Sequence, residues 1–320
     1  MTTTRKILIS EFMDAAAVDR LSSVFTVHYV PDLVDRPDAL IAAAREVDAL
    51  IVRNRTQVKG ALLDALPDGV VIGRLGVGLD NIDVATAEAR GIRVIAATGA
   101  NADSVAEYVI ATSLVLLRGS LLSSGEVAAG QWPRARLSNG REAAGKQLGL
   151  VGFGDIGQRV ARLAHAIGMR VVAHDPVVAA DDARWHATGV RAVTLDALLA
   201  ESDVISLHVP LLPSTRGLID AAKLARVKPR AVLINTARGQ IVDEAALAQA
   251  LRDGRLAGAA VDVFEHEPLP AQSALADAPN LILTPHVAGV TEESNVRVSA
   301  LIADAVTEAL LAREVVHGTH

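Results

Sequence analysis

Short apolar runs alternate with amphipathic stretches along the chain. In the first hundred residues the apolar runs predict strands at 7–10, 25–30, 49–52, 70–74 and 93–96. The amphipathic stretches between them predict helices near 14–21, 37–46, 59–66 and 83–90. A second series of strands is predicted at 146–151, 169–174, 190–194, 204–208, 231–235, 257–262 and 280–284. Such alternation is typical of parallel sheets covered by helices on both faces. The pattern predicts an α/β protein with two doubly wound parallel-sheet domains.

The segments between and after the two series predict the domain organisation. A long helix at 101–123, which begins at Asn101 or Asp103 as its cap, links the two domains. The last helix, near 292–313, has no strand after it, and its simplest packing returns it to the first domain. We therefore expect a discontinuous domain of residues 1–100 plus 289–320 and a second domain of 101–288. The glycine-rich segment 125–145 is either a dimer arm or a surface loop.

Composition narrows the possible functions. The chain has 320 residues, of which 51% are hydrophobic, and a net charge of -6, which argues against nucleic acid or an anionic membrane as a partner. It contains no cysteine, so thiolate metal sites and cysteine nucleophiles are excluded, and a reducing cytoplasm is the expected location. Glu11 and Asp14 interrupt the N-terminal apolar run too early for a signal peptide. Charged residues also interrupt 105–122, so a buried helix is expected there rather than a membrane span.

One glycine motif indicates a dinucleotide. The stretch Gly152-Phe153-Gly154-Asp155-Ile156-Gly157 follows a predicted strand and begins a predicted helix, as the G-x-G-x-x-G fingerprint requires. Gly152 permits the sharp turn, Gly154 leaves room for the phosphate, and Gly157 lets the helix pack closely on the strand. The N–H groups at the start of the helix then face the anion.

A carboxylate after the next strand strengthens this interpretation. Asp175 follows the strand at 169–174, about twenty residues beyond the glycines, where the fingerprint places the acid that binds ribose hydroxyls. The same carboxylate would repel a 2′-phosphate. We therefore expect NAD rather than NADP, and 101–288 becomes the NAD-binding domain.

Three further strand ends carry the polar groups that redox chemistry on a hydroxy acid needs. Arg238, Glu267 and His286 follow the strands at 231–235, 257–262 and 280–284, and ligands of open parallel sheets bind at these carboxyl ends. Arg238 suits a substrate carboxylate through a bidentate contact, and His286 suits the hydroxyl proton as a general base. Glu267 would hold the imidazole and stabilise its protonated form. The hydride belongs to the cofactor.

These motifs, in this order, resemble those of the D-isomer-specific 2-hydroxyacid dehydrogenases over nearly the whole chain. The resemblance includes His174-Asp175-Pro176, His208-Val209-Pro210-Leu211, Thr236-Ala237-Arg238-Gly239 and Thr284-Pro285-His286. It implies that the arginine binds substrate, that the histidine is the acid/base and that the glutamate pairs with it. It also implies a flavodoxin-like substrate domain, a Rossmann NAD-binding domain, a cleft between them and a homodimer.

The same resemblance implies further binding positions. For the cofactor they are Gly152, Gly154, Asp155, Ile156, Gly157, Asp175, His208, Val209, Pro210, Thr215, Thr236, Ala237, Arg238, Asp262, His286 and Gly289, with Asp262 at the nicotinamide amide. For the substrate they are Arg53, Val77, Gly78, Arg238 and His286, with the N–H groups of the Gly76–Asn81 loop on its carboxylate. The other histidines have no partner pattern, and no metal site is expected.

The substrate remains open at this point. Arg53, Arg55 and Arg134 of a partner subunit suggest a second negative group, as in 3-phosphoglycerate or sulfolactate. A hydroxypyruvate or glyoxylate reductase is the alternative within the family. An NAD-sensing corepressor-like binding protein is the alternative from another class, since such proteins can keep the same three residues.

Overall fold

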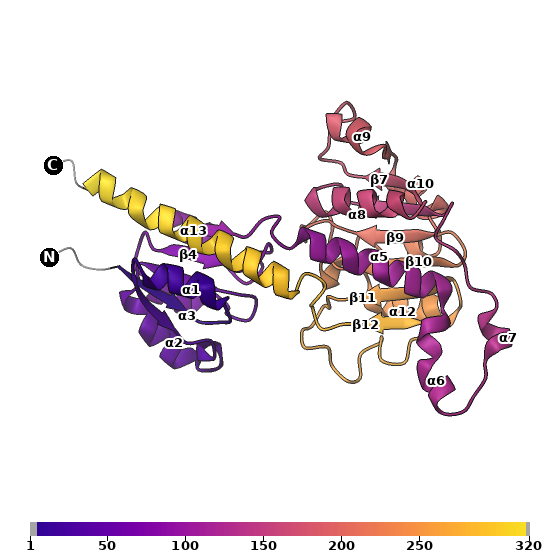
Figure 1. Cartoon of the computed structure of the whole chain (residues 1–320), viewed down its shortest axis with the longest axis horizontal. Helices are drawn as coiled ribbons and strands as arrows, with labels where there is room; N and C mark the ends of the chain where they lie inside the picture. Colours follow the sequence, from indigo (N-terminus) through magenta and orange to yellow (C-terminus); the bar gives the residue numbers. More distant parts are fainter. Residues whose placement is uncertain (1–4, 318–320) are drawn as a thin grey trace. The chain divides into compact units, whose positions relative to one another are not determined.

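The computed structural model describes residues 5–317, which divide into two compact units (Figure 1). Of the described residues, unit 1 comprises 5–101 and 290–317, and unit 2 comprises Ala102–Gly289. The last helix, α13 (Glu292–His317), packs on three elements of unit 1, namely β4 (Val71–Arg74), β5 (Arg93–Ala96) and α1 (Ala15–Ser22). Unit 1 is therefore assembled from two separate segments of the chain.

Unit 1 is a five-stranded parallel sheet with the strand order β2-β1-β3-β4-β5. Along β1, Ile7 and Ile9 belong to the core cluster under α1 and α13, whereas Leu8 belongs to the cluster under α2 and α3. This alternation buries both faces of the sheet, as expected for parallel strands. Besides α13 and the 3-10 helices Leu33–Asp35 and Ala44–Glu46, its elements are β1 (Lys6–Ile9), α1 (Ala15–Ser22), β2 (Thr26–Tyr29), α2 (Pro37–Ala43), β3 (Ala49–Val52), α3 (Gly60–Ala65), β4 (Val71–Arg74), α4 (Val84–Ala89) and β5 (Arg93–Ala96).

Unit 2 is a seven-stranded parallel sheet with the order β12-β11-β10-β9-β6-β7-β8. Its elements are α5 (Ala102–Arg118), α6 (Ser124–Ala128), α7 (Arg134–Leu137), β6 (Gln147–Val151), α8 (Asp155–Ala166), β7 (Arg170–His174), α9 (Ala183–Thr188), β8 (Arg191–Ala192), α10 (Leu195–Glu201), β9 (Val204–Leu207), α11 (Ala221–Leu224), β10 (Ala231–Asn235), α12 (Glu244–Arg252), β11 (Leu256–Val261) and β12 (Leu281–Leu283), together with the 3-10 helices Ser120–Ser123 and Gly239–Ile241.

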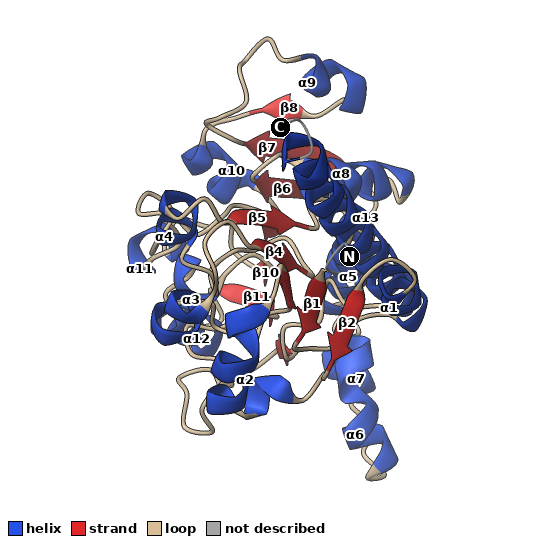
Figure 2. Cartoon of the chain, turned by 90° about the vertical axis from the view of Figure 1, so that its left-hand side faces the viewer, coloured by secondary structure: helices blue, strands red, loops and turns tan. Residues whose placement is uncertain are grey.

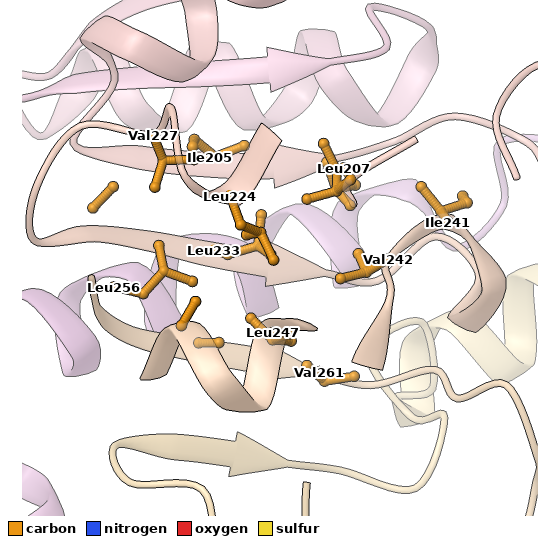
Figure 3. Packing of buried hydrophobic residues seen from close by; sticks show 14 of the residues in the cluster. Ile205, Leu207, Leu224, Val227, Leu233, Ile241, Val242, Leu247, Leu256 and Val261 are labelled. Carbon is orange, nitrogen blue, oxygen red and sulfur yellow. The ribbon is translucent and has the colours of Figure 1, made fainter. Parts of the chain in front are cut away.

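Two hydrophobic clusters cover the two faces of this sheet. Leu148 and Leu150 of β6 pack under α5 and α8, whereas Leu233 of β10 packs under the helices on the opposite face. Figure 3 shows this opposite cluster, formed among others by Ile205, Leu207, Leu224, Val227, Leu233, Leu247, Leu256 and Val261. Both sheets and their order agree with the predicted doubly wound α/β fold.

The connection after α5 differs from the prediction. The expected continuous helix at 101–123 ends at Arg118, because Gly119 takes the left-handed conformation with φ +70° and a 3-10 helix follows. Segment 125–145, expected to be irregular, contains α7 and most of α6, and both views place these helices away from the sheet of unit 2 (Figure 1, Figure 2).

No single described helix is long and apolar enough to cross a membrane. One bent pair, Ala102–Arg118 with Ser120–Ala128, meets the length and composition test, but its two parts differ in direction by 72°.

Strand order decides where each unit can hold a ligand. The order reverses between β6 and β9 in unit 2 and between β1 and β3 in unit 1. Loops that leave the carboxyl ends of strands on opposite sides of such a point diverge and leave a crevice. In unit 2 the glycine motif follows β6, and in unit 1 Glu11 and Arg53 follow β1 and β3.

Candidate active site

The glycine motif forms a tight turn between β6 and α8. Gly152 has φ +97°, and a Cβ atom there would lie 2.4 Å from the carbonyl oxygen of His208. A Cβ atom at Gly157 would lie 2.6 Å from the carbonyl oxygen of Gly152, so the helix can approach the strand only without a side chain. Above Gly154, by contrast, a Cβ atom would meet nothing within 4 Å. The turn therefore leaves open space beside the N–H groups of the first turn of α8.

Asp175 is fixed beside this turn by backbone hydrogen bonds. Its Oδ2 accepts from the Phe153 N–H at 2.8 Å, and its Oδ1 accepts from the Val177 N–H at 3.0 Å. The Phe153 ring is fully buried and stacks on Trp185, with 4.6 Å between the ring centroids. Each carboxylate oxygen has a further lone pair, so Asp175 can still accept from hydroxyl groups of a ligand.

The loop after β9 lies against the glycine turn. His208 is partly buried, its Nε2 lies 2.9 Å from Ser206 Oγ, and desolvation lowers the pKa of its imidazole to about 4. The ring is thus neutral at physiological pH and supports the structure. Further along the loop, Thr215 Oγ1 donates to the Pro210 carbonyl oxygen at 2.6 Å.

The Arg238 loop after β10 is held by a buried amide. Asn235 Oδ1 accepts from the Ala237 N–H at 3.1 Å, and its Nδ2 donates to the Arg238 carbonyl oxygen at 2.9 Å. A Cβ atom at Gly239 would lie 1.9 Å from the carbonyl carbon of Phe264. Only glycine lets this loop cross so close to the loop that carries Glu267. Thr236 Oγ1 is buried here without a hydrogen-bond partner among the described residues, which marks a place for a ligand atom.

Arg238, Glu267 and His286 come together in unit 2. Glu267 Oε2 lies 2.8 Å from His286 Nδ1, and Glu267 Oε1 accepts from the Phe264 N–H at 3.1 Å. Desolvation acts to raise the pKa of the Glu267 carboxyl. The hydrogen bond and charge of His286, the Phe264 N–H and the charge of Arg238 outweigh it and lower that pKa below its ordinary value. The carboxylate stays charged and holds Nδ1, so Nε2 of His286 is available to a ligand.

The pair of Glu267 and His286 is only partly shielded from solvent. The Glu267 and His286 side chains are 36% and 38% exposed within this chain. The backbone of His286 has φ +57°, which non-glycine residues adopt uncommonly and which costs on the order of 1–3 kcal/mol. Residues held in this way concentrate at functional sites.

Asp262 makes its hydrogen bonds within the chain. It is 1% exposed, and its two oxygens accept from the N–H groups of Val287 and Ala288, both at 2.8 Å. Thr284 Oγ1 donates to the same carboxylate at 2.6 Å. Asp262 thus holds the segment on both sides of His286. The sequence predicted only a contact of Asp262 with the nicotinamide amide, not this structural role.

In unit 1, two buried polar side chains shape the loop at 53–56. Glu11 accepts from the N–H groups of Arg53 at 2.8 Å, Arg55 at 3.1 Å and Thr56 at 2.9 Å. Asn81 Nδ2 donates to the carbonyl oxygens of Arg53 at 3.0 Å and Thr56 at 2.7 Å. The loop conformation is therefore independent of the Arg53 side chain.

Arg53 and Arg55 have different surroundings. Arg55 is exposed and forms an ion pair with Asp35. Arg53 is partly buried, donates to Asn295 Oδ1 at 2.6 Å and lies 5.7 Å from the centroid of the Phe12 ring. No carboxylate of the described residues lies within ion-pair distance of its guanidinium. Burial lowers the pKa of Arg53, against the charge of Glu11, but a guanidinium remains charged. Arg53, not Arg55, has a charge free for an anion.

The predicted carboxylate-binding loop also has free donors. The Gly76 N–H donates to the Arg74 carbonyl oxygen, and the Gly76 carbonyl oxygen accepts from the Ala97 N–H. The N–H groups of Val77 and Gly78 donate to no acceptor in the described part of the chain. This pair can bind an anionic oxygen.

Sequence reasoning missed the residues that hold these loops. Glu11 and Asn235 were not assigned positioning roles, although each is a polar residue at the carboxyl end of a buried apolar strand. That position was the available signal. What could not be deduced is that both side chains bind backbone groups of neighbouring loops.

Comparison with known proteins decides the family. A family model described as the NAD-binding domain of D-isomer specific 2-hydroxyacid dehydrogenases matches residues 110–288. The (S)-sulfolactate dehydrogenase of Chromohalobacter salexigens is 54% identical over 304 residues, which cover 95% of this chain and 98% of that protein. The chain belongs to the D-isomer-specific 2-hydroxyacid dehydrogenase family. It is an NAD-dependent oxidoreductase of 2-hydroxy acids.

Two further members of this dehydrogenase family illustrate its range. The D-3-phosphoglycerate dehydrogenase of Mycobacterium bovis is 41% identical over 95% of this chain, which spans only 56% of that longer protein. The structure of D-lactate dehydrogenase from Aquifex aeolicus complexed with NAD and lactic acid has a TM-score of 0.84 and 28% identity, and the match covers 96% of each chain. The residues around the glycine turn fit such a cofactor, since they combine open space, unpaired donors and a fixed carboxylate.

Gly154→Ala tests the open space above the glycine turn. The added methyl group meets no atom of the protein, so the melting temperature should stay within about 2 °C of wild type. NADH affinity should fall at least about tenfold, because the methyl group occupies the space left for phosphate. Fluorescence titration with NADH measures this effect. Gly125→Ala, which also meets no atom within 4 Å, is the control for NADH affinity and should leave it unchanged. Equal NADH affinity in both variants would contradict the assignment.

Proposed function

We propose that this dehydrogenase interconverts a 2-hydroxy acid that carries a second anionic group, of the sulfolactate type, and its 2-oxo acid. The observation that supports the substrate class is the partly buried guanidinium of Arg53, which has no carboxylate partner among the described residues. An uncompensated buried charge is costly unless a ligand neutralises it. A sulfonate or a phosphate would do so, and the similarity to a sulfolactate dehydrogenase favours the sulfonate.

Three residues of unit 2 act on the reacting carbon in this proposal. Arg238 binds the substrate carboxylate. In the oxidative direction His286 Nε2 accepts the proton of the 2-hydroxyl group, and in the reductive direction it returns a proton to the carbonyl oxygen. Glu267 holds Nδ1 at 2.8 Å and stabilises the imidazolium. The cofactor, when bound, supplies or accepts the hydride at C2.

Cofactor binding is assigned to the loops at the carboxyl ends of β6, β7, β9 and β10. The first turn of α8, from Asp155 and Ile156, provides N–H donors for the pyrophosphate. Asp175 accepts from the adenosine ribose hydroxyls. Thr236 Oγ1, which is buried and has no partner among the described residues, donates to the cofactor. The loop residues from His208 to Thr215 and the backbone of Ala237 and Gly289 complete the proposed contacts.

We also propose that the enzyme is a homodimer formed through the segment of α6 and α7. This segment and the 3-10 helix before it expose Leu121 (64%), Leu122 (43%), Val127 (44%) and Trp132 (77%). A concentration of exposed apolar side chains on a projecting segment is typical of a protein interface. We place this dimer in the cytoplasm, since its cofactor must be regenerated by other enzymes after every turnover.

Glu267→Gln tests the acid/base pair through its pH dependence. The amide keeps the size of the side chain but removes the negative charge that stabilises the imidazolium of His286. The basic limb of the kcat/KM profile for 2-oxo acid reduction should therefore move to lower pH by about one unit or more. Glu265→Gln, a neighbouring exposed acid, is the control and should leave the profile in place. An unmoved basic limb in Glu267→Gln would exclude the proposed pairing.

Arg53→Gln tests the substrate class. Glu11 holds the loop through backbone groups, so the substitution should leave the loop in place while it removes the charge and the contacts of the guanidinium with Asn295 and Phe12. The kcat/KM for 3-sulfolactate should fall roughly 10- to 100-fold, the loss of one charge-assisted hydrogen-bonded contact. The kcat/KM for lactate should change less than about threefold by the same comparison. Arg55→Gln, whose side chain pairs with Asp35, is the control for both substrates. An equal loss of kcat/KM for sulfolactate and for lactate would show that Arg53 does not bind the second anionic group.

Trp132→Glu combined with Leu121→Glu tests the homodimer. Burying two carboxylates in the apolar interface should cost more free energy than dimerisation gains. The variant should therefore sediment as a monomer, with half the mass of the dimer. Sedimentation equilibrium measures this. Val177→Glu, at a side chain that is 90% exposed elsewhere in unit 2, is the control. A wild-type chain that sediments as a monomer would refute the dimer.

A further inference from the structure

The backbone of His286 needs an external constraint. Its φ of +57° lies in the left-handed region, from which a non-glycine residue relaxes unless its surroundings hold it. The His286 N–H donates to the carbonyl oxygen of Thr284 at 3.0 Å, two residues earlier. The conformation of Thr284 therefore decides the direction in which the imidazole points.

Thr284 is held by two partners from other elements. Its Oγ1 lies 2.6 Å from the carboxylate of Asp262, at the end of β11, and 2.6 Å from the hydroxyl of Tyr108, on α5. Both oxygens of Asp262 also accept backbone N–H groups, from Val287 and Ala288. The segment around His286 is thus fastened to α5 and β11 at the same time.

The donors in this chain of hydrogen bonds can be assigned. Asp262 accepts at both oxygens, so the single hydroxyl proton of Thr284 is donated to it. The Tyr108 hydroxyl must then donate to Thr284 Oγ1. Burial, the largest influence, and the charge of Asp262 raise the pKa of Tyr108 while the hydrogen bond to Thr284 lowers it, and the net shift is upward. The phenol keeps its proton, and the order of donation is Tyr108 to Thr284 to Asp262.

We propose that Tyr108 and Thr284 are positioning residues for His286. The Tyr108 hydroxyl donates a hydrogen bond to Thr284 Oγ1, which directs the hydroxyl proton of Thr284 to Asp262. Without that donor the hydroxyl can turn away, and the segment can relax toward an ordinary backbone conformation. Displacement of a reacting group by about 1 Å can cost on the order of a hundredfold in rate. This inference rests on the proposed acid/base role of His286.

The two tyrosines of the chain provide a matched test. Tyr108→Phe should lower kcat for 2-oxo acid reduction roughly tenfold, while the KM for the oxo acid and the Kd for NADH change less than about twofold. Tyr29→Phe in unit 1 also removes a partly buried hydroxyl, which hydrogen-bonds the backbone of Met13, and should leave all three constants unchanged. A merely structural role would not separate kcat from the two binding constants in this way.

Thr284 variants test the order of the hydrogen bonds from Tyr108 through Thr284 to Asp262. Thr284→Val should lose at least as much kcat as Tyr108→Phe, and Thr284→Ser, which keeps the hydroxyl, should restore most of it. The double variant Tyr108→Phe with Thr284→Val should be no slower than Thr284→Val alone, because both changes remove the same connection. Multiplicative losses in the double variant would overturn the proposal.

His286→Asn distinguishes the two levels of inference. If this variant retains wild-type kcat, the acid/base assignment fails, and the positioning roles fail with it. If it is inactive while Tyr108→Phe has the kcat of Tyr29→Phe, only the positioning roles are refuted. If it is inactive and Tyr108→Phe shows the kcat loss at unchanged NADH affinity, both assignments are supported.

Discussion

The candidate active site of unit 2 depends on one constraint: its seven strands all run in the same direction. Every loop that leaves the carboxyl end of a strand therefore emerges at one edge of the sheet, and strand neighbours bring distant loops together. Arg238 follows β10 and Glu267 follows its neighbour β11, while His286 follows β12 on the far side of β11. At Gly239 the loops after β10 and β11 cross so closely that no side chain fits between them. Adjacent parallel strands thus assemble a site from residues far apart in the chain.

Buried polar side chains then hold these loops in shape. Glu11 and Asp262 each use their carboxylate on backbone N–H groups, and Asn235 uses its amide in the same way. Hydrogen bonds from backbone N–H groups to a buried carboxylate are charge-assisted and stronger than neutral ones. Because the Glu11 contacts involve only backbone groups, the loop at 53–56 is held whichever side chains it presents, whereas the segment around His286 also depends on the Thr284 hydroxyl. Arg53, for example, can vary while its loop remains held by Glu11.

Most of the fold could be predicted from the sequence because the central strands of both sheets, such as β3, β6, β9 and β10, are short and fully buried. Apolar runs such as 49–52 and 231–235 match β3 and β10 without any shift. The end of α5 was not predicted correctly, because the apolar pattern continues past Arg118 and only the left-handed Gly119 interrupts the helix. The edge strand β8 is also shorter than the apolar run at 190–194, because β8 pairs on one side only.

The sequence by itself determined the chemical groups and the order in which they follow the strands. The glycine spacing, Asp175 and the trio of Arg238, Glu267 and His286 are local features, and the direction of the strands places them at one edge. Only the tertiary structure decided which side chains are free to act. Arg53 and Arg55 are two residues apart and alike in sequence, yet Asp35 pairs with Arg55 and none of the described carboxylates pairs with Arg53. Likewise, the Tyr108–Thr284–Asp262 contacts join three elements, and such long-range contacts leave no periodic signal in the sequence.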